Sequence, residues 1–338
     1  MTLRVPAPPP GAEPPSGEPG PEHVSDASVF AEPALRGDLA TRSKVTRVVS
    51  GDVGLRDRLV EIWRSRELLR NLVRTEISVK YKNSVLGIIW SMISPAMTLA
   101  IFFVVFQFIA KNGVPHFVIF LFSGLLVWNL FQLGVLSATG VVVNNSGLVK
   151  KVSFPREILA LASIGSASVF FVFQAIVMVI FMVAFHAQPD WSLLWLLPLA
   201  FAALIFLAVS LAIFLSAVNV YLRDTQHLVE VLLTAWFWAS PIVYAYAPLA
   251  KKMALHHIPV WIYFLNPMTP IVLTYQRVIY NHVFVINTVT HQPYQVLPVW
   301  GWSRYVEIDL AVMAVGVVLT GLALLVFGHL EGNFAEEL

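Results

Sequence analysis

Long apolar stretches alternate with short polar segments along the chain from residue 86 onward, whereas the first 50 residues contain no such stretch. About 20 predominantly apolar residues are enough to cross a bilayer as a helix. Stretches of about this length occur at roughly 86–110, 117–141, 158–185, 193–219, 228–246 and 306–329. The pattern predicts an all-α polytopic membrane protein in which residues 86–330 form a domain of six transmembrane helices.

The segment 55–85, which precedes the first predicted span, combines an apolar stripe with a basic face. The stripe recurs at helical offsets and consists of Leu55, Leu59, Ile62, Leu69 and Leu72. The opposite face carries six arginines, Arg56, Arg58, Arg64, Arg66, Arg70 and Arg74. A helix of this kind lies in the plane of the membrane surface, so the pattern predicts an N-terminal amphipathic interfacial helix. Ordinary basic flanking of the next span is the alternative.

Residues 248–282 do not fit a simple span. They are interrupted by Pro248, Pro259, Pro267 and Pro270. The apolar halves 258–265 and 268–275 are each too short to cross a bilayer. Broken helices at membrane depth are tolerated where they are buried in protein or line a wet cavity. We therefore predict two short re-entrant helices that dip in from the external face, followed by an external loop over 283–304.

The positions of Lys and Arg predict the orientation. Most of them precede the first span or lie in the loops 144–157 and 221–227, which share one side of a six-span protein. Basic loops stay in the cytoplasm, so both termini are expected there, with 331–338 as a cytoplasmic tail. Residues 1–50 are rich in Pro, Gly, Glu and Ser, a composition that predicts a disordered cytoplasmic tail.

Composition narrows the classes of function. The chain is 57% hydrophobic and 12% charged, whereas soluble domains average about 25% charged residues. The net charge of +2, without a basic recognition motif, argues against a nucleic-acid partner. The absence of cysteine excludes disulfides and thiolate metal sites, and we expect no metal site.

Motifs for catalysis and for self-powered transport are missing from the sequence. No GxxxxGK followed by Ser or Thr is present, so the chain has no P-loop with which to hydrolyse ATP. Nor does it contain HExxH or GxSxG. A carrier driven by protons or sodium would keep ionisable residues at mid-membrane depth, and the predicted spans lack them. We therefore expect a transport subunit with no catalytic residue and an external energy source.

Aromatic residues crowd the first and fifth predicted spans. Those that could line a channel are Trp90, Phe102, Phe106, Trp236, Trp238 and Tyr244. Most aromatics in such helices pack against neighbours or lie in interfacial belts. A subset facing a pore could stack on sugar rings, because these side chains combine an apolar face with a polar group. The sequence leaves both possibilities open.

Four segments, which follow one another in consistent order between about 65 and 330, resemble a known family. They are 68–97 (LLRNLVRTEISVKYKNSVLGIIWSMISPAM), 149–159 (VKKVSFPREIL), 217–233 (AVNVYLRDTQHLVEVLL) and 263–280 (YFLNPMTPIVLTYQRVIY). Together they are similar to the ABC type-2 permeases that export polysaccharides, including O-antigen, capsule and teichoic-acid exporters. The Pro-rich first 50 residues lie outside this resemblance.

The resemblance implies a homodimer of this permease paired with two ABC ATPase subunits. ATP and magnesium would lie on the partner, so this chain would hold no cofactor. A helix in the loop after the second span would dock on the ATPase through Lys150, Lys151, Phe154, Pro155, Arg156 and Glu157. The first and fifth spans would line the channel at the dimer interface.

The resemblance also implies roles at the two ends of the transport path. The basic segment before the first span would frame a cytoplasmic entrance for a polyprenyl-linked glycan, with Arg74, Lys80, Tyr81 and Lys82. The re-entrant helices would gate the external end, with Tyr263, Asn266, Pro267 and Arg277.

The expected function is therefore export of a lipid-linked polysaccharide across the bacterial inner membrane, powered by ATP on the partner. One alternative keeps the transporter class but moves a lipid, drug or other small molecule. Another is a membrane-embedded glycosyltransferase, for which Glu157 and Asp224 are the obvious internal carboxylates. Each follows an arginine that could simply pair with it.

Overall fold

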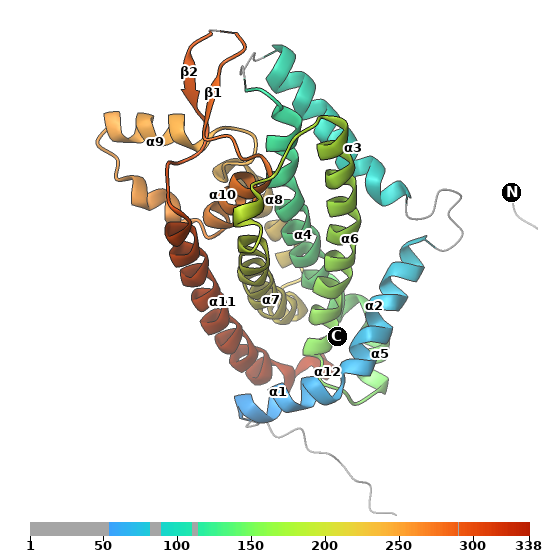
Figure 1. Ribbon diagram of the computed structural model, residues 1–338. Helices are drawn as coiled ribbons and strands as arrows, with labels where there is room; N and C mark the ends of the chain where they lie inside the picture. The colour runs from blue at the N-terminus through green and yellow to red at the C-terminus, as the bar shows by residue number, and fades with distance from the viewer. Residues whose placement is uncertain (1–53, 82–88, 110–113, 290) are drawn as a thin grey trace, which may run out of the picture. The chain divides into compact units, whose positions relative to one another are not determined.

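The structure is a computed structural model that describes residues 54–81, 89–109, 114–289 and 291–338 (Figure 1). Four of its helices are long and apolar enough to cross a membrane: α4 (Phe117–Asn144), α6 (Glu157–Ala184), α7 (Leu196–Tyr221) and α11 (Trp302–Glu331). They correspond to the spans predicted at 117–141, 158–185, 193–219 and 306–329. The chain is therefore a mostly helical, polytopic membrane protein.

Helix α4 is the most deeply buried of the four. In its most apolar 18-residue window 83% is buried, compared with 28% in α6 and in α11. It contacts α3, α6, α7, α8 and α10, and the rings of Phe120, Trp128 and Phe131 are almost fully buried in these contacts. A helix that is apolar all round belongs in the interior of a bundle. The elements of the candidate site are positioned against α4.

Glycines set two close helix contacts. At Gly134 of α4, an added Cβ would lie 2.8 Å from Cδ1 of Ile164 in α6. At Gly316 of α11, an added Cβ would lie 2.9 Å from the Cβ of Phe206 in α7. Small residues let helix backbones approach closely in membrane bundles. These two positions therefore fix how α6 sits on α4 and how α11 sits on α7.

The other two predicted spans differ from the expectation. The first is α3 (Ile89–Phe103), continued by the π-helical segment η1 (Val104–Ile109); 86–88 and 110 lie outside the described residues. The fifth span was predicted as one helix over 228–246. Its predicted C-terminal end is wrong, because α8 (Thr225–Ala239) ends seven residues earlier. Pro241 follows, and a residue before proline is pushed out of the helical region. At 15 residues, α8 is about 22 Å long, short of the ~30 Å hydrocarbon core.

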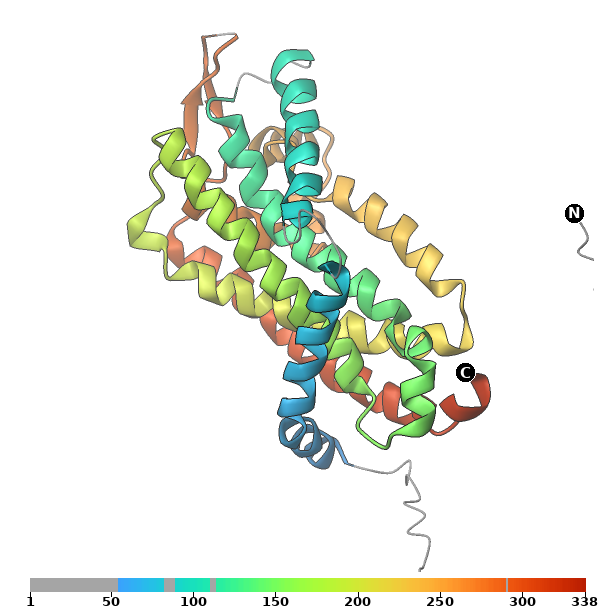
Figure 2. The ribbon, with the colours of Figure 1, turned by 90° about the vertical axis from the view of Figure 1, so that its right-hand side faces the viewer.

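The predicted interfacial helix over 55–85 is two helices, α1 (Leu55–Arg64) and α2 (Arg66–Tyr81), with a break at Ser65; 82–85 lie outside the described residues. Helix α2 runs along the first half of α6. Val73 lies against Gly165, and Lys80 lies over the ring of Phe170. Figure 2 shows α2 against the face of the bundle. A helix lying flat across the ends of the spans is therefore not confirmed, because part of its apolar stripe packs on a span.

Arg58 was listed with the arginines of the basic face, but unlike Arg56 it is not exposed. Its side chain is buried and paired with Glu157 and Glu331. The predicted tail 331–338 is also not free. It forms α12 (Phe334–Glu337), whose Phe334 ring is fully buried and meets Tyr221 of α7. The helices α1 and α12 lie at the same end of the bundle, with α5 (Ser146–Lys151) nearby (Figure 1).

Between α8 and α11 the chain forms several short elements. These are α9 (Tyr246–Leu255), the 3-10 helix η3 (Val260–Leu265), α10 (Met268–Ile279), and the strands β1 (Phe284–Ile286) and β2 (Pro293–Gln295). Every residue of α10 except Arg277 is buried, which agrees with a broken helix enclosed in protein. The expected half-helix 258–265 is a 3-10 helix instead.

The antiparallel strands pair Val285 with Tyr294, where a plain loop was predicted over 283–304, so the fold is not strictly all-α. The run Phe284–Ile286 is apolar and β-branched, which favours a strand. The hairpin lies at the end of the bundle opposite α1 (Figure 1).

Candidate functional site

An aromatic cluster joins α3 to α8 over the surface of α4. The ring of Phe102 stacks on Phe237 with centroids 5.7 Å apart, and it meets the edge of Trp238 at 6.2 Å. Phe106 meets Phe102 at 6.2 Å, while Trp236 packs on Phe131 of α4. Such offset and edge contacts are the favoured aromatic geometries. The cluster is only partly enclosed, because Trp238 is 51% exposed.

Four of the six predicted channel residues, Phe102, Phe106, Trp236 and Trp238, thus gather in or beside this cluster. A fifth, Tyr244, contacts the cluster through its hydroxyl, which donates a hydrogen bond to the carbonyl oxygen of Trp238. The side chain of the sixth, Trp90, lies outside the described residues.

Asn266 links the end of α8 to the start of α10. Its Oδ1 accepts hydrogen bonds from Nε1 of Trp236 at 2.7 Å and from the backbone N–H of Met268 at 3.0 Å. Its Nδ2 donates to the carbonyl oxygen of Ala239 at 3.1 Å and to Oγ of Ser240 at 3.0 Å. Free carbonyls at a helix C-terminus and free N–H groups at an N-terminus need such partners. One amide side chain therefore caps two helices at once.

Two tyrosines extend this link toward η3. The hydroxyls of Tyr244 and Tyr263 are 2.5 Å apart, and the hydroxyl of Tyr244 donates to the carbonyl of Trp238 at 3.1 Å. Since Tyr244 has one proton to give, Tyr263 is the donor in the shared bond. Burial, and then this hydrogen bond, raise the pKa of Tyr263. We call Trp236, Tyr244, Tyr263 and Asn266 the neutral network.

The predicted external gate residues divide between two places. Tyr263 and Asn266 belong to the neutral network, and Pro267 follows as the N-cap of α10. Arg277, near the other end of α10, makes an ion pair with Asp190 at 3.1 Å and donates to Oδ1 of Asn281 at 2.6 Å. Arg277 therefore fastens α10 to the turn between α6 and α7, away from the aromatic cluster.

Asp190 also holds its own turn together. It accepts hydrogen bonds from the hydroxyl of Ser192 at 2.5 Å and from its backbone N–H at 3.2 Å, which begins η2 (Trp191–Leu193). The hydroxyl bond, and after it the charge of Arg277, lower the pKa of Asp190.

A group of four charged side chains lies at the opposite end of the bundle. Arg58 pairs with Glu157 and, at 3.5 Å, with Glu331. Arg156 pairs with Glu331 at 3.6 Å and donates to its carbonyl oxygen at 2.8 Å. We call Arg58, Arg156, Glu157 and Glu331 the charged cluster. It ties α1, the start of α6 and the end of α11 together.

The six predicted docking residues therefore do not form one surface helix. Helix α5 ends at Lys151, so Phe154 and Arg156 lie in irregular chain, while Glu157 begins α6. Lys150 and Lys151 are exposed, Phe154, Pro155 and Arg156 are half-buried, and Glu157 is buried. Glu157 was a catalytic candidate in the glycosyltransferase alternative. It is paired with Arg58, a partner 99 residues away that its sequence neighbourhood did not reveal.

The predicted entrance residues are partly described. Lys80 lies with its ammonium 4.5 Å from the ring centroid of Phe170, and burial lowers the pKa of Lys80. Arg74 is exposed. The side chain of Tyr81 and all of Lys82 lie outside the described residues. Glu76, which was not among the predicted site residues, lies one helical turn before Lys80 and faces the same cavity.

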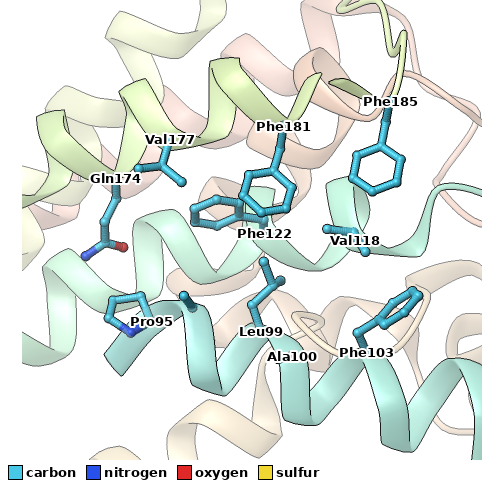
Figure 3. Close-up of a pocket in the computed structure, with 11 residues that line it drawn as sticks. Pro95, Leu99, Ala100, Phe103, Val118, Phe122, Gln174, Val177, Phe181 and Phe185 are labelled. Carbon is cyan, nitrogen blue, oxygen red and sulfur yellow. The ribbon is translucent and has the colours of Figure 1, made fainter. Parts of the chain in front are cut away.

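An apolar pocket of about 270 Å³ lies between α3, α4 and α6. Leu99, Phe122 and Phe181 point toward one another across it (Figure 3). Gln174 is the one polar lining residue, and its Oε1 accepts a hydrogen bond from Asn129 at 2.9 Å. Such a pocket offers no reactive group and suits a hydrocarbon chain. Among the described residues, no group of three or more His, Cys, Asp or Glu could hold a metal ion.

Comparisons with known proteins agree with the resemblance. Residues 67–280 match the family described as ABC-2 type transporter. The chain is similar to an O-antigen export system permease protein RfbA of Myxococcus xanthus, with 29% identity over 222 residues, 66% of this chain and 84% of that protein. It is also similar to a protein of the same name from Klebsiella pneumoniae, with 25% identity over 272 residues, 80% of this chain and 95% of the relative.

Proposed function

The chain belongs to the ABC-2 type transporter family, and we propose that it is the permease subunit of an exporter that moves a lipid-linked polysaccharide across the bacterial inner membrane. Relatives named as O-antigen export permeases cover most of its length, which supports a polysaccharide as the cargo. The family is one of permeases, so the proposal assigns this chain no catalytic step.

The observation that carries the choice of cargo is the aromatic cluster and its continuation into the neutral network. Phe102 and Trp238 offer rings, Trp238 with its side chain half exposed. Beyond them, Tyr244, Tyr263 and Asn266 offer hydroxyl and amide groups. Sugars need both kinds of contact, apolar faces for their C–H groups and hydrogen-bond partners for their hydroxyls. A purely aliphatic path would suit a lipid or drug better.

ATP hydrolysis is assigned to a separate ABC ATPase subunit, which would bind ATP and magnesium. The lack of a P-loop in this chain supports this division of labour. We place the contact with the ATPase on the exposed residues 150–153 of the loop, together with the half-buried Phe154 and Pro155. Arg156 and Glu157 would support this surface without contacting the ATPase, because their ion pairs hold the loop against α1 and α11.

We further propose that two copies of the chain pair through α3 and α8. Helix α8 carries exposed apolar side chains at helical spacing, Leu228, Val231, Leu232 and Trp238. On α3 and η1, Met97, Ile101 and Phe108 are also more than half exposed. Helix α8 lies at the edge of the bundle (Figure 2), and a second copy would cover this face and enclose the aromatic cluster.

A second candidate, export of a lipid or small molecule, is favoured by the pocket between α3, α4 and α6. Its lining is almost wholly apolar. The pocket would hold a hydrocarbon but gives no contact suited to a sugar.

The test is complementation of a strain that lacks the gene, with surface polysaccharide measured by immunoblotting of intact cells. We expect the deletion to trap lipid-linked glycan inside, and Phe102→Ala with Trp238→Ala to restore less than about a tenth of the wild-type surface polysaccharide. Trp191→Ala, which removes an exposed indole outside the cluster, is the matched control. Normal surface polysaccharide in the deletion strain would refute the proposal.

The same strains separate the two candidates. If Leu99→Trp, which fills the apolar pocket, abolishes resistance to a toxic lipid or drug while surface polysaccharide stays normal, the second candidate is favoured. Copurification of an ABC ATPase with the tagged wild-type chain, and its loss with Lys150→Ala and Lys151→Ala, tests the placement of the docking surface.

A further inference from the structure

A second cavity, of about 300 Å³, lies between α2, α4 and α6. Its lining includes charged and polar side chains, whereas the pocket between α3, α4 and α6 is almost wholly apolar. Helix α2 contributes Glu76 and Lys80, α4 contributes Ser137 and Asn144, and α6 contributes Phe170. Side chains from three helices that are far apart in sequence thus converge on one space, and they include one anion and one cation.

Glu76 and Lys80 do not neutralise each other, although a glutamate four residues before a lysine is well placed to do so on a helix. The carboxylate of Glu76 instead accepts hydrogen bonds from Ser163 at 3.2 Å and from Ser166 at 2.7 Å. The ammonium of Lys80 lies over the ring of Phe170, and among the described residues no carboxylate lies within ion-pair distance of it. The carboxylate of Glu76 and the ammonium of Lys80 therefore each contact α6, and neither is neutralised by an ion pair among the described residues, so both can bind a charged group in the cavity.

One side of the cavity lies at the level of the lipid headgroups, and the cavity extends from there along α6 to Phe170, halfway along that helix. Helices α4 and α6 each have 28 residues, about 42 Å of helix, so their ends extend beyond a ~30 Å hydrocarbon core. Asn144 is the last residue of α4, which puts one side of the cavity at the level of the headgroups. Further along α6, Val172, Ile176, Val179 and Ile180 form an exposed apolar surface beside which acyl chains could run.

We propose that this cavity binds a phospholipid whose headgroup joins a phosphodiester to a primary ammonium, as in phosphatidylethanolamine. The phosphodiester would meet the ammonium of Lys80, and the headgroup ammonium would meet the carboxylate of Glu76. The pair of opposite charges decides the class of ligand. An anionic headgroup would be repelled by Glu76, and a purely cationic ligand by Lys80. A diphosphate would bring at least two negative charges to a cavity with one lysine.

The lipid would fill the space between α2 and the two spans and so hold α2 in place. This assignment is separate from the exported cargo, and binding can be measured on the full-length chain without its ATPase or any polysaccharide.

The experiment is a native mass spectrometry titration of the delipidated, full-length chain with phosphatidylethanolamine, phosphatidylglycerol and phosphatidylcholine of matched acyl chains. We expect phosphatidylethanolamine to bind about tenfold more tightly than phosphatidylglycerol, the difference that one charge-assisted hydrogen bond gives. Phosphatidylcholine keeps both charges but donates no N–H, and should fall between them. Equal or tighter binding of phosphatidylglycerol by the wild-type chain would overturn the proposal.

Two variants test the two charges. Lys80→Gln should weaken phosphatidylethanolamine about tenfold, and Glu76→Gln should remove the preference over phosphatidylglycerol. Arg70→Gln removes an exposed arginine of the same helix and should change neither value. The preference is a ratio within each variant, so partial loss of stability in Glu76→Gln does not obscure it. A preference unchanged in both Lys80→Gln and Glu76→Gln would overturn the site.

Glycerophosphoethanolamine, which has the same headgroup and no acyl chains, separates a lipid from a soluble ligand. We expect it to compete only at concentrations at least a hundredfold higher. Competition at equal concentration would mean that the acyl chains contribute nothing, and it would overturn the assignment to a lipid.

Discussion

The two ends of the bundle are held together by different kinds of interaction. At the end that carries α1 and α12, the charged cluster joins three elements through buried arginines and glutamates. At the end that carries the hairpin, the neutral network joins α8, η3 and α10 through hydroxyl, indole and amide groups. Both networks are partly or fully buried, and both join segments far apart in sequence.

The difference lies in what each network costs to open. Removing one member of a buried ion pair leaves an uncompensated charge and costs about 3–5 kcal/mol. A neutral hydrogen bond contributes about 1 kcal/mol net and can be exchanged for one with water or a ligand hydroxyl. The charged cluster is therefore suited to transmit force as a rigid joint, whereas the neutral network is suited to rearrange when a hydroxyl-rich cargo arrives.

The largest expected effect is at the charged cluster. Arg58→Met removes the cation shared by Glu157 and Glu331 and should lower the free energy of unfolding by about 3–5 kcal/mol. Thermal unfolding of the purified chain in detergent measures this loss. Arg56→Met removes an exposed arginine two residues before Arg58 on the same helix. This variant should change the unfolding free energy by less than about 0.5 kcal/mol. Equal effects of the two variants would show that the charged cluster does not hold this end.

The next effect is at the centre of the neutral network. Asn266→Ala removes the acceptor for Trp236 and the caps of α8 and α10, and should cost about 1–2 kcal/mol. We expect export to fall much further than stability, because the relation of α8 to α10 changes. Asn266→Asp keeps the acceptor for Trp236 and Met268 and should recover part of the export. Loss of stability as large as in Arg58→Met would remove the distinction between the two ends.

Hydropathy and proline positions predicted much of this fold. The four long spans were placed within a few residues because a 20-residue apolar stretch has few alternatives in a membrane protein. The interruption of 248–282 also followed from its prolines. The end of α8 was missed although Pro241 is visible in the sequence, because the apolar stretch continues past it to Tyr246.

The networks themselves were beyond sequence analysis, because they depend on contacts between distant segments. Arg58 looks like any other arginine on a basic helix face, and its partner Glu157 is 99 residues away. Trp236 and Asn266 were both proposed for function, one for a channel and one for a gate, but only the fold joins them by a hydrogen bond. Polar residues that face a partner in tertiary structure carry no local signal of it.

A smaller effect is expected where the neutral network loses a single bond. Tyr263→Phe removes the donor to Tyr244 but leaves the bond from Tyr244 to the carbonyl of Trp238. The free energy of unfolding should fall by about 0.5–1.5 kcal/mol, measured by thermal unfolding as above. Tyr294→Phe changes a half-buried tyrosine of β2 outside this network and serves as the control. A loss above about 3 kcal/mol in Tyr263→Phe would mean that the network is not readily opened.

The smallest effect tests the ion pair between Asp190 and Arg277 at the hairpin end. Because the pKa of Asp190 is lowered in the folded chain, its ionised form stabilises the fold above the ordinary aspartate pKa of about 3.9. That contribution is lost as the pH falls through the lowered pKa, since the folded and unfolded chains then bind the same proton.

At pH 7, Asp190→Asn should therefore cost about 1 kcal/mol or less, since both side chains keep some exposure to solvent. The melting temperatures of wild type and variant should converge as the pH falls below about 4 and through the lowered pKa of Asp190. Asp224→Asn, an exposed aspartate before α8, should show no such convergence. A difference between wild type and Asp190→Asn that stays constant from pH 7 down to about pH 2 would mean that the side chain acts through shape and hydrogen bonding, with its charge contributing little, and that charge matters only at the α1 end.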